Sequence, residues 1–458
     1  MAMGKRRRET QGSLFIAADR LPKTAGHPFY QRLNQLLAEA GFDTWIEDRC
    51  REYYAADGSS GRPSIPPGVY FRMLLVGYFE GIDSQRGIAW RCADSLGLRH
   101  FLGLSLEESG PDHSTLTNTR KRLPAEVFEE VFQFVLSIAA LKGLLAGKTV
   151  GVDSTTLEAD AAMKSIVRKD TGEVWRAYVV RLMREEGLVE ADQEPTDEEV
   201  RRYDRGRKDK RVTNDEWQSS TDPDSRIAKM KDGRTHLAYK AEHVVDLATE
   251  LVLAAEIYPA NRADTDTLLD SVMQAKLNVD AAHERAGLGG ERIEEVAADK
   301  GYHAAATLEL ADALSLRTYI PEPKHKHRSR WSGKPEAYRT AVVNNRRRTG
   351  RAKSRRLQRL RSERVERSFA HTCETGGARR SWLRGLADVT KRYLMTAAAH
   401  NLGRVLRKHF GVGKPRGLRG LWRPYARLAA VLPARLWLLM AFALGRERRR
   451  GAARPSAA

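Results

Sequence analysis

The hydrophobic residues in the first third of the chain recur at helical spacing. In the segment FYQRLNQLLAEAGF, Leu33, Leu36 and Leu37 stand three and four positions apart, on one face of a helix. The segment SIPPGVYFRMLLVGYFEGI begins with prolines, which favour a first helical turn, and then becomes apolar. The pattern predicts a run of short helices from Pro28 to about Leu141.

Two further helices in this region are predicted from capping residues. Asp83 or Ser84 is suited to begin a helix in DSQRGIAWRCADSLGLRHFLGL, and Asp112 or Ser114 is suited to begin one in PDHSTLTNTRKRLPAEVF. Short helices with arginine-bearing faces suit a DNA-binding domain. A plain helical packing domain explains these residues equally well.

From Gly147 onward the apolar residues come in short runs typical of strands. Two of these runs are separated only by residues 246–249 and predict a hairpin. Helical patterns lie between the later runs, in DTDTLLDSVMQAKLNV and HAAATLELADAL. This order predicts an α/β architecture, a mixed sheet flanked by helices. The predicted strands are KTVGVDST, HLAYKAEHVVDL, TELVLAAEIYPA, IEEVAADKGYH and LRTYIPEP.

Two charged segments interrupt the α/β pattern. Residues 163–232 contain EADQEPTDEEVRRYDRGRKDKR and few aromatic or β-branched residues, so we expect a helix followed by a mobile loop. Residues 324–367 form the most basic stretch of the chain. A solvated or disordered tail is the ordinary interpretation of such a run, but the helix-like sequence around it favours a surface that contacts phosphates.

Charge and composition indicate which kinds of molecule the chain is expected to bind. The 458 residues carry a net charge of +20, with a pI near 9.9. A clustered basic excess favours a polyanion, and nucleic acid is the first expectation. A solubility device or a proteome rich in arginine is the alternative. The three scattered cysteines form no CxxC pair, so we expect reduced cytosolic thiols and no zinc site; they are Cys50, Cys92 and Cys373.

The two ends of the chain raise the question of targeting. The N-terminal MAMGKRRRETQG is basic, but no apolar core of the signal-peptide type follows it. The segment Leu428 to Leu444 is apolar, yet it is short for a membrane span and is interrupted by a proline and an arginine. We expect a terminal helix that packs on the body or on a partner, with an interfacial membrane helix as the alternative.

Three acidic residues are candidates for a site. Asp153 is predicted to end the first strand, Asp299 is predicted to end the fourth, and Glu366 lies in the helical stretch LRSERVERSFAH. Sites of α/β proteins lie at the carboxyl ends of strands, so the two aspartates are expected to meet if their strands are neighbours. A helix that crosses the sheet would add Glu366. A turn or cap is the alternative role for either aspartate.

Clustered carboxylates repel one another unless a cation lies between them. Mg²⁺ and Mn²⁺ prefer oxygen ligands, and two such ions support in-line phosphoryl transfer. The three acids therefore point to two-metal chemistry on a phosphodiester, although their spacing alone does not show that they meet.

Four motifs, in this order along the chain, resemble the DDE transposases of bacterial insertion sequences, which belong to the ribonuclease-H-like superfamily. They are GVDSTTLEADA, DPDSRIAKMKDGRTHLAYKAEHVVD, VAADKGYH and VERSFAHTCETGGARRSWLRG. The N-terminal segments GIDSQRGIAWRCADSLGLRHFLGL and PDHSTLTNTRKRL resemble the helical domain of that family. The resemblance runs from about Pro28 to Arg416.

The resemblance implies that Asp153, Asp299 and Glu366 bind the catalytic metals, two Mg²⁺ or Mn²⁺ ions. Glu363 is a rival for the third acid, and Glu374 is a weaker one. In the wider family a tyrosine, an arginine and a lysine accompany the glutamate. The matching positions here hold Arg359, Ser362 and Cys373, so that signature is incomplete.

Other residues are expected to contact DNA or to support the site. Lys300 and His303 follow Asp299 closely and are either phosphate contacts or ordinary polar residues after a strand. Asp160 is a possible supporting residue near the metals. The arginines expected to contact phosphate are Arg361, Arg364, Arg367 and Arg379.

The function implied is that of a transposase, which cleaves DNA at terminal inverted repeats and joins the 3′-hydroxyl ends to target DNA. Its partner is double-stranded DNA, its active complex a dimer, and its location the bacterial cytoplasm at the nucleoid, not the membrane. A nuclease that cuts without joining, or an inactive DNA-binding derivative, is the alternative. We expect a basic flexible N-terminus at residues 1–27, a helical DNA-binding domain at 28–145, a ribonuclease-H-like catalytic domain at 146–410 and a basic, apolar tail at 411–458. The catalytic domain is expected to contain the charged insertion at about 163–232 and the basic segment at about 324–365.

Overall fold

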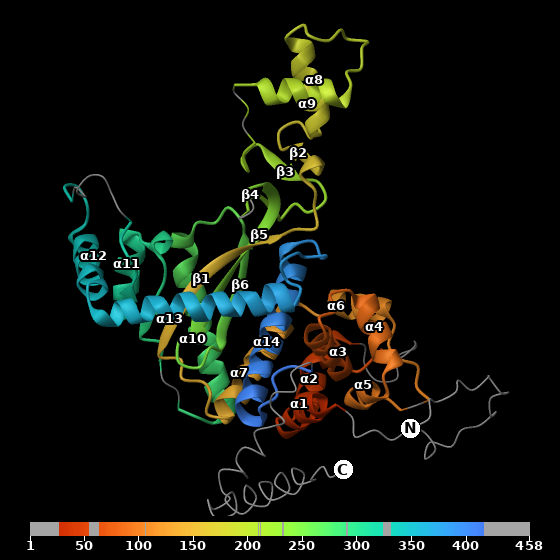
Figure 1. Cartoon of the computed structure of the whole chain (residues 1–458), viewed down its shortest axis with the longest axis vertical. Helices are drawn as coiled ribbons and strands as arrows, with labels where there is room; N and C mark the ends of the chain where they lie inside the picture. The colour runs from red at the N-terminus through yellow and green to blue at the C-terminus, as the bar shows by residue number, and fades with distance from the viewer. Residues whose placement is uncertain are drawn as a thin grey trace, which may run out of the picture.

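The computed structural model of the chain is shown in Figure 1. It describes residues 27–54, 64–105, 107–208, 210, 212–230, 233–289, 292–323 and 331–415. The predicted basic N-terminus, apart from residue 27, and the apolar segment 428–444 lie outside the described residues. In the described part of the chain, no helix has the length and hydropathy needed to cross a membrane.

The N-terminal third is helical, as predicted. Ser84 Oγ accepts a hydrogen bond from Gly87 N (3.1 Å), and Asp112 Oδ1 accepts one from Ser114 N (2.8 Å), so these two residues are the helix caps. Between the capped helices the apolar residues turn inward into a continuous core. The helices are α1 (Pro28–Glu39), α2 (Phe42–Cys50), α3 (Pro67–Glu80), α4 (Gln85–Asp94), α5 (Leu96–Phe101), α6 (His113–Arg122) and α7 (Ala125–Leu141).

The later part of the chain forms the predicted mixed sheet. Strand β5 pairs antiparallel with β1, β4 and β6, whereas β7 pairs parallel with β1 and β8. The order along the sheet is β4-β5-β1-β7-β8, and β6 pairs with β5. The predicted strands and the β5–β6 hairpin are confirmed. The strands are β1 (Thr149–Glu158), β4 (Arg226–Lys229), β5 (Thr235–Asp246), β6 (Val252–Pro259), β7 (Glu295–Ala297) and β8 (Arg317–Tyr319).

One predicted strand boundary is wrong. Asp153 does not end β1, which continues to Glu158. The polar residues after Asp153 continue to pair with β5, as far as Glu158 opposite Ala238, whereas the parallel pairing with β7 stops at Gly151. Asp153 therefore lies just beyond the point where β1 parts from its parallel neighbour.

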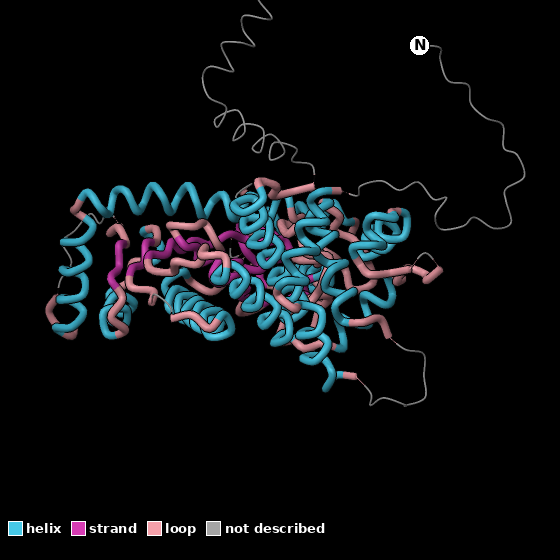
Figure 2. The backbone as a smooth tube through the Cα atoms, turned by 90° about the horizontal axis from the view of Figure 1, so that it is seen from below, coloured by secondary structure: helices cyan, strands magenta, loops and turns pink. Residues whose placement is uncertain are grey.

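Helices cover both faces of the sheet (Figure 2). Helix α13 crosses one face and packs on β1, while α10 packs on the other face against β5 and β6. Helices α7 and α14 pack against each other and join the N-terminal helices to the sheet in one core. The helices in this half are α10 (Asp264–Ala286), α11 (Ala305–Ala313), α12 (Glu336–Thr349), α13 (Ala352–Phe369) and α14 (Leu386–Phe410).

The charged insertion is more ordered than its composition predicts. It forms an arm that projects from the sheet (Figure 1), and its helices α8 and α9 enclose a small core of their own. At its base, the Arg168 guanidinium stacks on the rings of Tyr178 and Trp217. A few apolar residues at helical spacing and one stacked arginine are enough to order a polar segment. The elements of the arm are β2 (Ile166–Arg168), α8 (Trp175–Glu185), α9 (Asp197–Gly206) and β3 (Trp217–Ser219).

A pair of glutamates faces α10 across strands β5 and β6. Glu242 is fully buried and stands opposite Glu256 in the strand register. Burial raises the pKa of Glu256 to about 7, and the nearby Glu129 and Glu242 carboxylates add to the rise. Like charges placed directly opposite each other in a sheet destabilise it. The fold therefore favours the protonated form of Glu256.

The expected consequence is a loss of stability as the pH rises. A glutamate in an unfolded chain titrates near pKa 4.3, so the stabilisation from protonated Glu256 is full below about pH 4 and is lost up to about pH 7. In Glu256→Gln this loss disappears. Relative to wild type, its free energy of unfolding should rise by on the order of 2–3 kcal/mol between about pH 5 and pH 8, measured by urea denaturation.

The exposed Glu198 on α9 provides the control. Glu198→Gln should leave the pH profile unchanged. An equal difference between Glu256→Gln and wild type at both pH values would contradict the burial argument.

Candidate active site

The sheet register brings the two predicted aspartates together. Gly151 pairs with Ala297 in the parallel β1–β7 ladder, and Asp153 and Asp299 each lie two residues further along their chains. Asp299 begins the short helical turn η4 (Lys300–Tyr302), and its Oδ1 accepts a hydrogen bond from Gly301 N (2.7 Å). Asp153, within β1, and Asp299, just after β7, thus each lie shortly beyond the last pair of the parallel ladder.

Burial and neighbouring charges have opposing effects on the Asp153 carboxylate. Burial raises the pKa of Asp153, the Arg361 guanidinium opposes the rise, and the Asp299 carboxylate adds to it. Arg361 Nη1 donates to Asp153 Oδ2 at 2.6 Å. The two aspartates are therefore close enough to repel each other, and an arginine supplies the positive charge between helix and strand.

Helix α13 reaches this position through a close contact with β1. A Cβ atom at Gly151 would lie 2.8 Å from Leu247 Cδ2 and 3.1 Å from both Arg361 Cγ and Val365 Cγ2. His243, the β5 partner of Asp153, fixes the helix further, because its Nδ1 bonds to Ser368 Oγ at 2.8 Å. Burial lowers the pKa of His243 to about 3, so this anchor is neutral.

The two flanks of α13 face opposite ends of the sheet. Gln358 Nε2 donates to the carbonyl oxygens of Ala298 (3.0 Å) and Tyr319 (2.6 Å), at the carboxyl ends of β7 and β8. Arg364 and Arg367, on the other flank, donate to the carbonyl of Leu247 and the carboxylate of Glu250, in the turn of the β5–β6 hairpin. The Gln358 flank therefore looks toward the two aspartates.

Glu366 lies toward the Gln358 side of α13, about 80° round the helix from Gln358. Arg355, Arg359, Ser362 and Glu366 follow one another at spacings of four, three and four residues, which places them on one stripe of the helix. The Glu366 side chain is exposed, and its Oε1 accepts a hydrogen bond from Ser362 Oγ (2.9 Å). Among the described residues, however, no three acidic, histidine or cysteine side chains are close enough to hold a metal ion.

The two rival acids have different surroundings. Glu363 pairs with Arg367 Nη2 on the same helix. Glu374 pairs with Arg379 (2.8 Å), whose Nη1 donates to Thr155 Oγ1 at 3.2 Å, near the far half of β1. The Glu363 carboxylate is therefore engaged in an ion pair, whereas Glu374 lies at the margin of the site.

The residues predicted to contact phosphate differ in their exposure and in the side chains they contact. Lys300 is exposed beside Asp299, whereas the His303 side chain is only 10% exposed, with Nε2 3.9 Å from Glu322 Oε1. Arg361 is bonded to Asp153, as described above. Asp160, a predicted supporting residue, pairs with Arg384 at 3.0 Å, outside the aspartate pair. Lys300 is the predicted cation that combines exposure with closeness to an aspartate.

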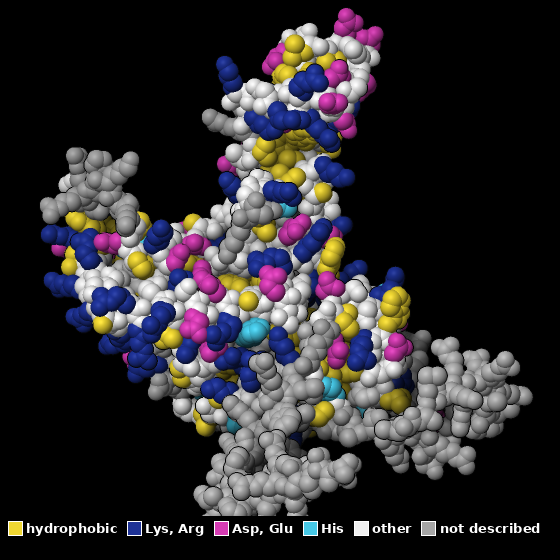
Figure 3. All heavy atoms as spheres, in the orientation of Figure 1, with side chains coloured by type: hydrophobic (Ala, Val, Ile, Leu, Met, Phe, Trp, Pro, Cys, Tyr) yellow, Lys and Arg dark blue, Asp and Glu magenta, His cyan; other side chains and the backbone are white. Residues whose placement is uncertain are grey.

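The predicted basic segment forms an exposed arginine surface over α12 and α13, visible at the left of Figure 3. Its first seven residues, 324–330, lie outside the described part. Several arginines of this surface are exposed and have no carboxylate of a described residue within ion-pair distance; these are Arg347, Arg351, Arg355, Arg356 and Arg359. The Arg355 and Arg359 pair of the stripe leads along α13 to Glu366.

Sequence reasoning missed the residues behind the aspartates. Ser154 Oγ donates to Asp264 Oδ1 (3.1 Å), and Lys240 Nζ lies 2.7 Å from the same oxygen. Asp264 begins α10, and an acid in the first turn of a helix resembles an ordinary dipole contact. The polar residues of β5, Lys240 and Glu242, alternate with apolar ones as in a solvated strand, although both are buried.

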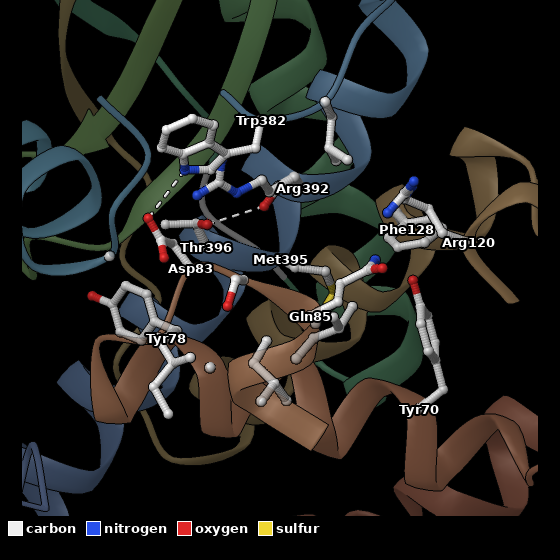
Figure 4. A pocket seen from close by; sticks show the side chains of 17 residues that line it. Tyr70, Tyr78, Asp83, Gln85, Arg120, Phe128, Trp382, Arg392, Met395 and Thr396 are labelled. Atoms are coloured by element: carbon white, nitrogen blue, oxygen red, sulfur yellow. Dashed lines mark hydrogen bonds between the residues drawn. The ribbon is translucent and has the colours of Figure 1, made fainter. Parts of the chain in front are cut away.

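A cavity of about 440 Å³ lies elsewhere, between the N-terminal helices and α14 (Figure 4). Trp382 is half exposed at this cavity, and its Nε1 donates to Asp83 Oδ2 (3.1 Å). Gln85 and Arg392 also line it. None of the three predicted acids lines this cavity, so the candidate active site is the open sheet edge and not the enclosed space.

Comparisons with known families agree with this arrangement. Residues 17–122 match a family described as Transposase domain (DUF772), and residues 190–402 match one described as Transposase DDE domain. The second match includes Asp299 and Glu366 and begins after Asp153. Neither the curated proteins nor the solved structures contain a match to this chain.

The close approach at Gly151 leads to a stability prediction. In Gly151→Ala the new methyl group must displace Leu247, Arg361 and Val365, so α13 moves away from β1. We expect a decrease of roughly 1–3 kcal/mol in the free energy of unfolding, the ordinary cost of overpacking. Gly289 has open space around it, so Gly289→Ala should change stability by less than about 0.5 kcal/mol in the same denaturant titration. Equal stability of both variants would show that α13 does not depend on this close approach.

Proposed function

Because this chain belongs to the insertion-sequence DDE transposases, we propose that it binds transposon ends, cleaves the DNA there and joins the freed 3′-hydroxyl to target DNA by two-metal phosphoryl transfer. The mixed sheet flanked by helices is the ribonuclease-H-like fold of DDE transposase domains. At the family level these are metal-dependent enzymes that act on DNA. The single observation that carries the proposal is the parallel register that sets Asp153 beside Asp299.

In this proposal Asp153, Asp299 and Glu366 hold the divalent ions. Their oxygen donors suit Mg²⁺ or Mn²⁺. When bound, such ions lower the pKa of a water or hydroxyl nucleophile and stabilise the leaving oxygen. The exposed Glu366 side chain would have to exchange its hydrogen bond with Ser362 for the metal ions. Glu366 is preferred over Glu363, because the Glu363 carboxylate is engaged in an ion pair with Arg367.

Arg361 supplies a positive charge to the Asp153 carboxylate when no metal ion is bound. Its guanidinium lies 2.6 Å from Asp153 Oδ2 and supplies the positive charge that the site needs. A divalent ion at Asp153 would compete for the same oxygen. The released guanidinium would then be available to a DNA phosphate, since arginine binds phosphate well.

DNA is proposed to approach along α13. Arg355, Arg359 and Lys300 are exposed on the side of the aspartates, so they neutralise phosphates that lead to the site. The N-terminal helices are proposed to recognise the element's ends. Two ends must be brought together for joining, so the active complex is proposed to be a dimer.

Removal of the three acids tests the catalytic assignment. Asp153→Ala, Asp299→Ala and Glu366→Ala should each reduce cleavage and strand transfer of labelled terminal-repeat DNA with Mg²⁺ or Mn²⁺. The reduction should exceed the roughly 100-fold that follows from removing an outer-shell residue. Glu363→Ala is the matched control on the same helix and should retain both activities.

The products distinguish the possible functions. Joined products support the transposase, cut products alone indicate a nuclease, and bound but intact DNA indicates an inactive derivative. If Glu363→Ala abolishes joining and Glu366→Ala does not, the assignment of the third acid is wrong.

The salt dependence of DNA binding tests the approach along α13. Removing one cation that binds a phosphate should reduce the slope of log K against log salt by about 0.9. We therefore expect Arg355→Ala combined with Arg359→Ala to flatten the slope by about 2, measured by fluorescence anisotropy. Arg356→Ala, about 60° further round α13 than Arg359 and away from Gln358, should change the slope by less than the pair does. A change with Arg356→Ala and none with the pair would place DNA on the other side of α13.

A further inference from the structure

A chain of polar groups, which becomes buried toward α10, lies behind the aspartate pair on the α10 face of the sheet. Asp264 Oδ1 accepts from Ser154 Oγ (3.1 Å) and lies 2.7 Å from Lys240 Nζ. Lys240 Nζ also bonds to Thr267 Oγ1 at 2.8 Å. Thr267 Oγ1 in turn lies 2.9 Å from Glu242 Oε2.

The chain ends at the turn that carries Asp299. Tyr302 OH donates to Glu242 Oε2 at 2.9 Å. Tyr302 and Glu242 are both completely buried, and the Lys240 side chain is 7% exposed. Lys240 and Glu242 are thus enclosed together, where their mutual attraction is strong but their loss of hydration is costly, whereas Asp264 is 34% exposed.

Both ends of the chain are next to a proposed metal ligand. Ser154 directly follows Asp153 in β1, and Tyr302 closes the turn that begins with Asp299. Asp264 also touches this turn. A Cβ atom at Gly301 would lie 3.0 Å from Asp264 Oδ2 and 2.9 Å from Asp299 Oδ1, so the turn lies against Asp264 only because residue 301 is glycine.

The polar chain provides a connection between the two aspartates that the strand pairing does not provide. The parallel pairing of β1 and β7 stops at Gly151 and Ala297, so no ladder hydrogen bond holds Asp153 and Asp299 at a fixed separation. Their carboxylates repel each other and would drive the two backbones apart. A rigid connection behind the pair is needed if a metal is to find its ligands already in place.

We propose that Ser154, Asp264, Lys240, Glu242 and Tyr302 form a brace that fixes the separation of Asp153 and Asp299. These are positioning residues, which act through the two aspartates and do not contact DNA or metal. The inference rests on the proposed function. A buried ionic network is seldom the most stable way to fill a core, and apolar residues would serve stability alone equally well.

Two variants each remove one hydroxyl of the brace without changing its volume much. Tyr302→Phe removes the hydroxyl that bonds to Glu242, and Ser154→Ala removes the one that bonds to Asp264. Tyr258→Phe is the matched control on the same face of the sheet, because the Tyr258 hydroxyl bonds to Ser271 (3.0 Å), a neighbour of Glu242, and not directly to a brace residue. Ser154→Thr keeps a hydroxyl and tests for rescue.

The primary measurement is Mn²⁺ binding to the full chain without DNA, followed by the free-ion signal in electron paramagnetic resonance. Tyr302→Phe and Ser154→Ala should each weaken binding by about 10- to 100-fold, as loss of an outer-shell partner does. Strand transfer in these variants should fail at low Mn²⁺ and recover as the Mn²⁺ concentration rises. Tyr258→Phe and Ser154→Thr should bind Mn²⁺ like wild type.

Thermal unfolding of each variant separates positioning from folding. A brace that only stabilises the fold would lower the melting temperature of Tyr302→Phe and leave its Mn²⁺ affinity unchanged, which overturns the inference. Equal weakening by Tyr258→Phe also overturns it. Asp153→Asn identifies a different failure: if this variant binds Mn²⁺ as wild type does, then the proposed metal site itself is wrong.

Discussion

Helix α13 can rest on strand β1 only because residue 151 has no side chain. The atoms of Leu247, Arg361 and Val365 occupy the space that a Cβ atom there would need. A glycine inside a strand weakens the strand, and it commonly marks a close approach of another element. Here the close approach sets where the helix crosses, and therefore which of its side chains reach the carboxyl ends of β1 and β7. The position of Arg361, and of the stripe that ends at Glu366, follows from this one feature.

The same edge concentrates charges that the fold must hold against their own repulsion. Arg361 pairs with Asp153 on the α13 face, and Asp264 and Lys240 pair with each other on the α10 face. If these groups act as the proposed brace, the fold gives up some stability for a site that is ready before its ligand arrives. An enzyme that assembles on DNA gains from this, because the order imposed in advance need not be created during binding.

Much of this architecture could be predicted from the sequence. The β5–β6 hairpin and the strands before Asp153 and Asp299 follow from short apolar runs, which depend on local pattern alone. The continuation of β1 to Glu158 could not be predicted, because polar residues extend the strand only when β5 is there to pair with them. The ordered structure of the arm could not be predicted for a similar reason. It depends on a few contacts between residues that are distant in the sequence, such as Arg168 on Trp217.

The candidate site divides in the same way. The family resemblance predicted the three acids of the site. It could not predict the pairing of Arg361 with Asp153 or the burial of Lys240, because both depend on packing.

The aspartate pair and Glu366 are proposed to share divalent ions. A crystal structure of the chain with Mn²⁺, using anomalous scattering, tests it most directly. We predict a peak about 2.1 Å from carboxylate oxygens of Asp153 and Asp299, with Arg361 moved away and Glu366 turned inward. An Asp153 still bonded to Arg361, with no peak at the sheet edge, would contradict it.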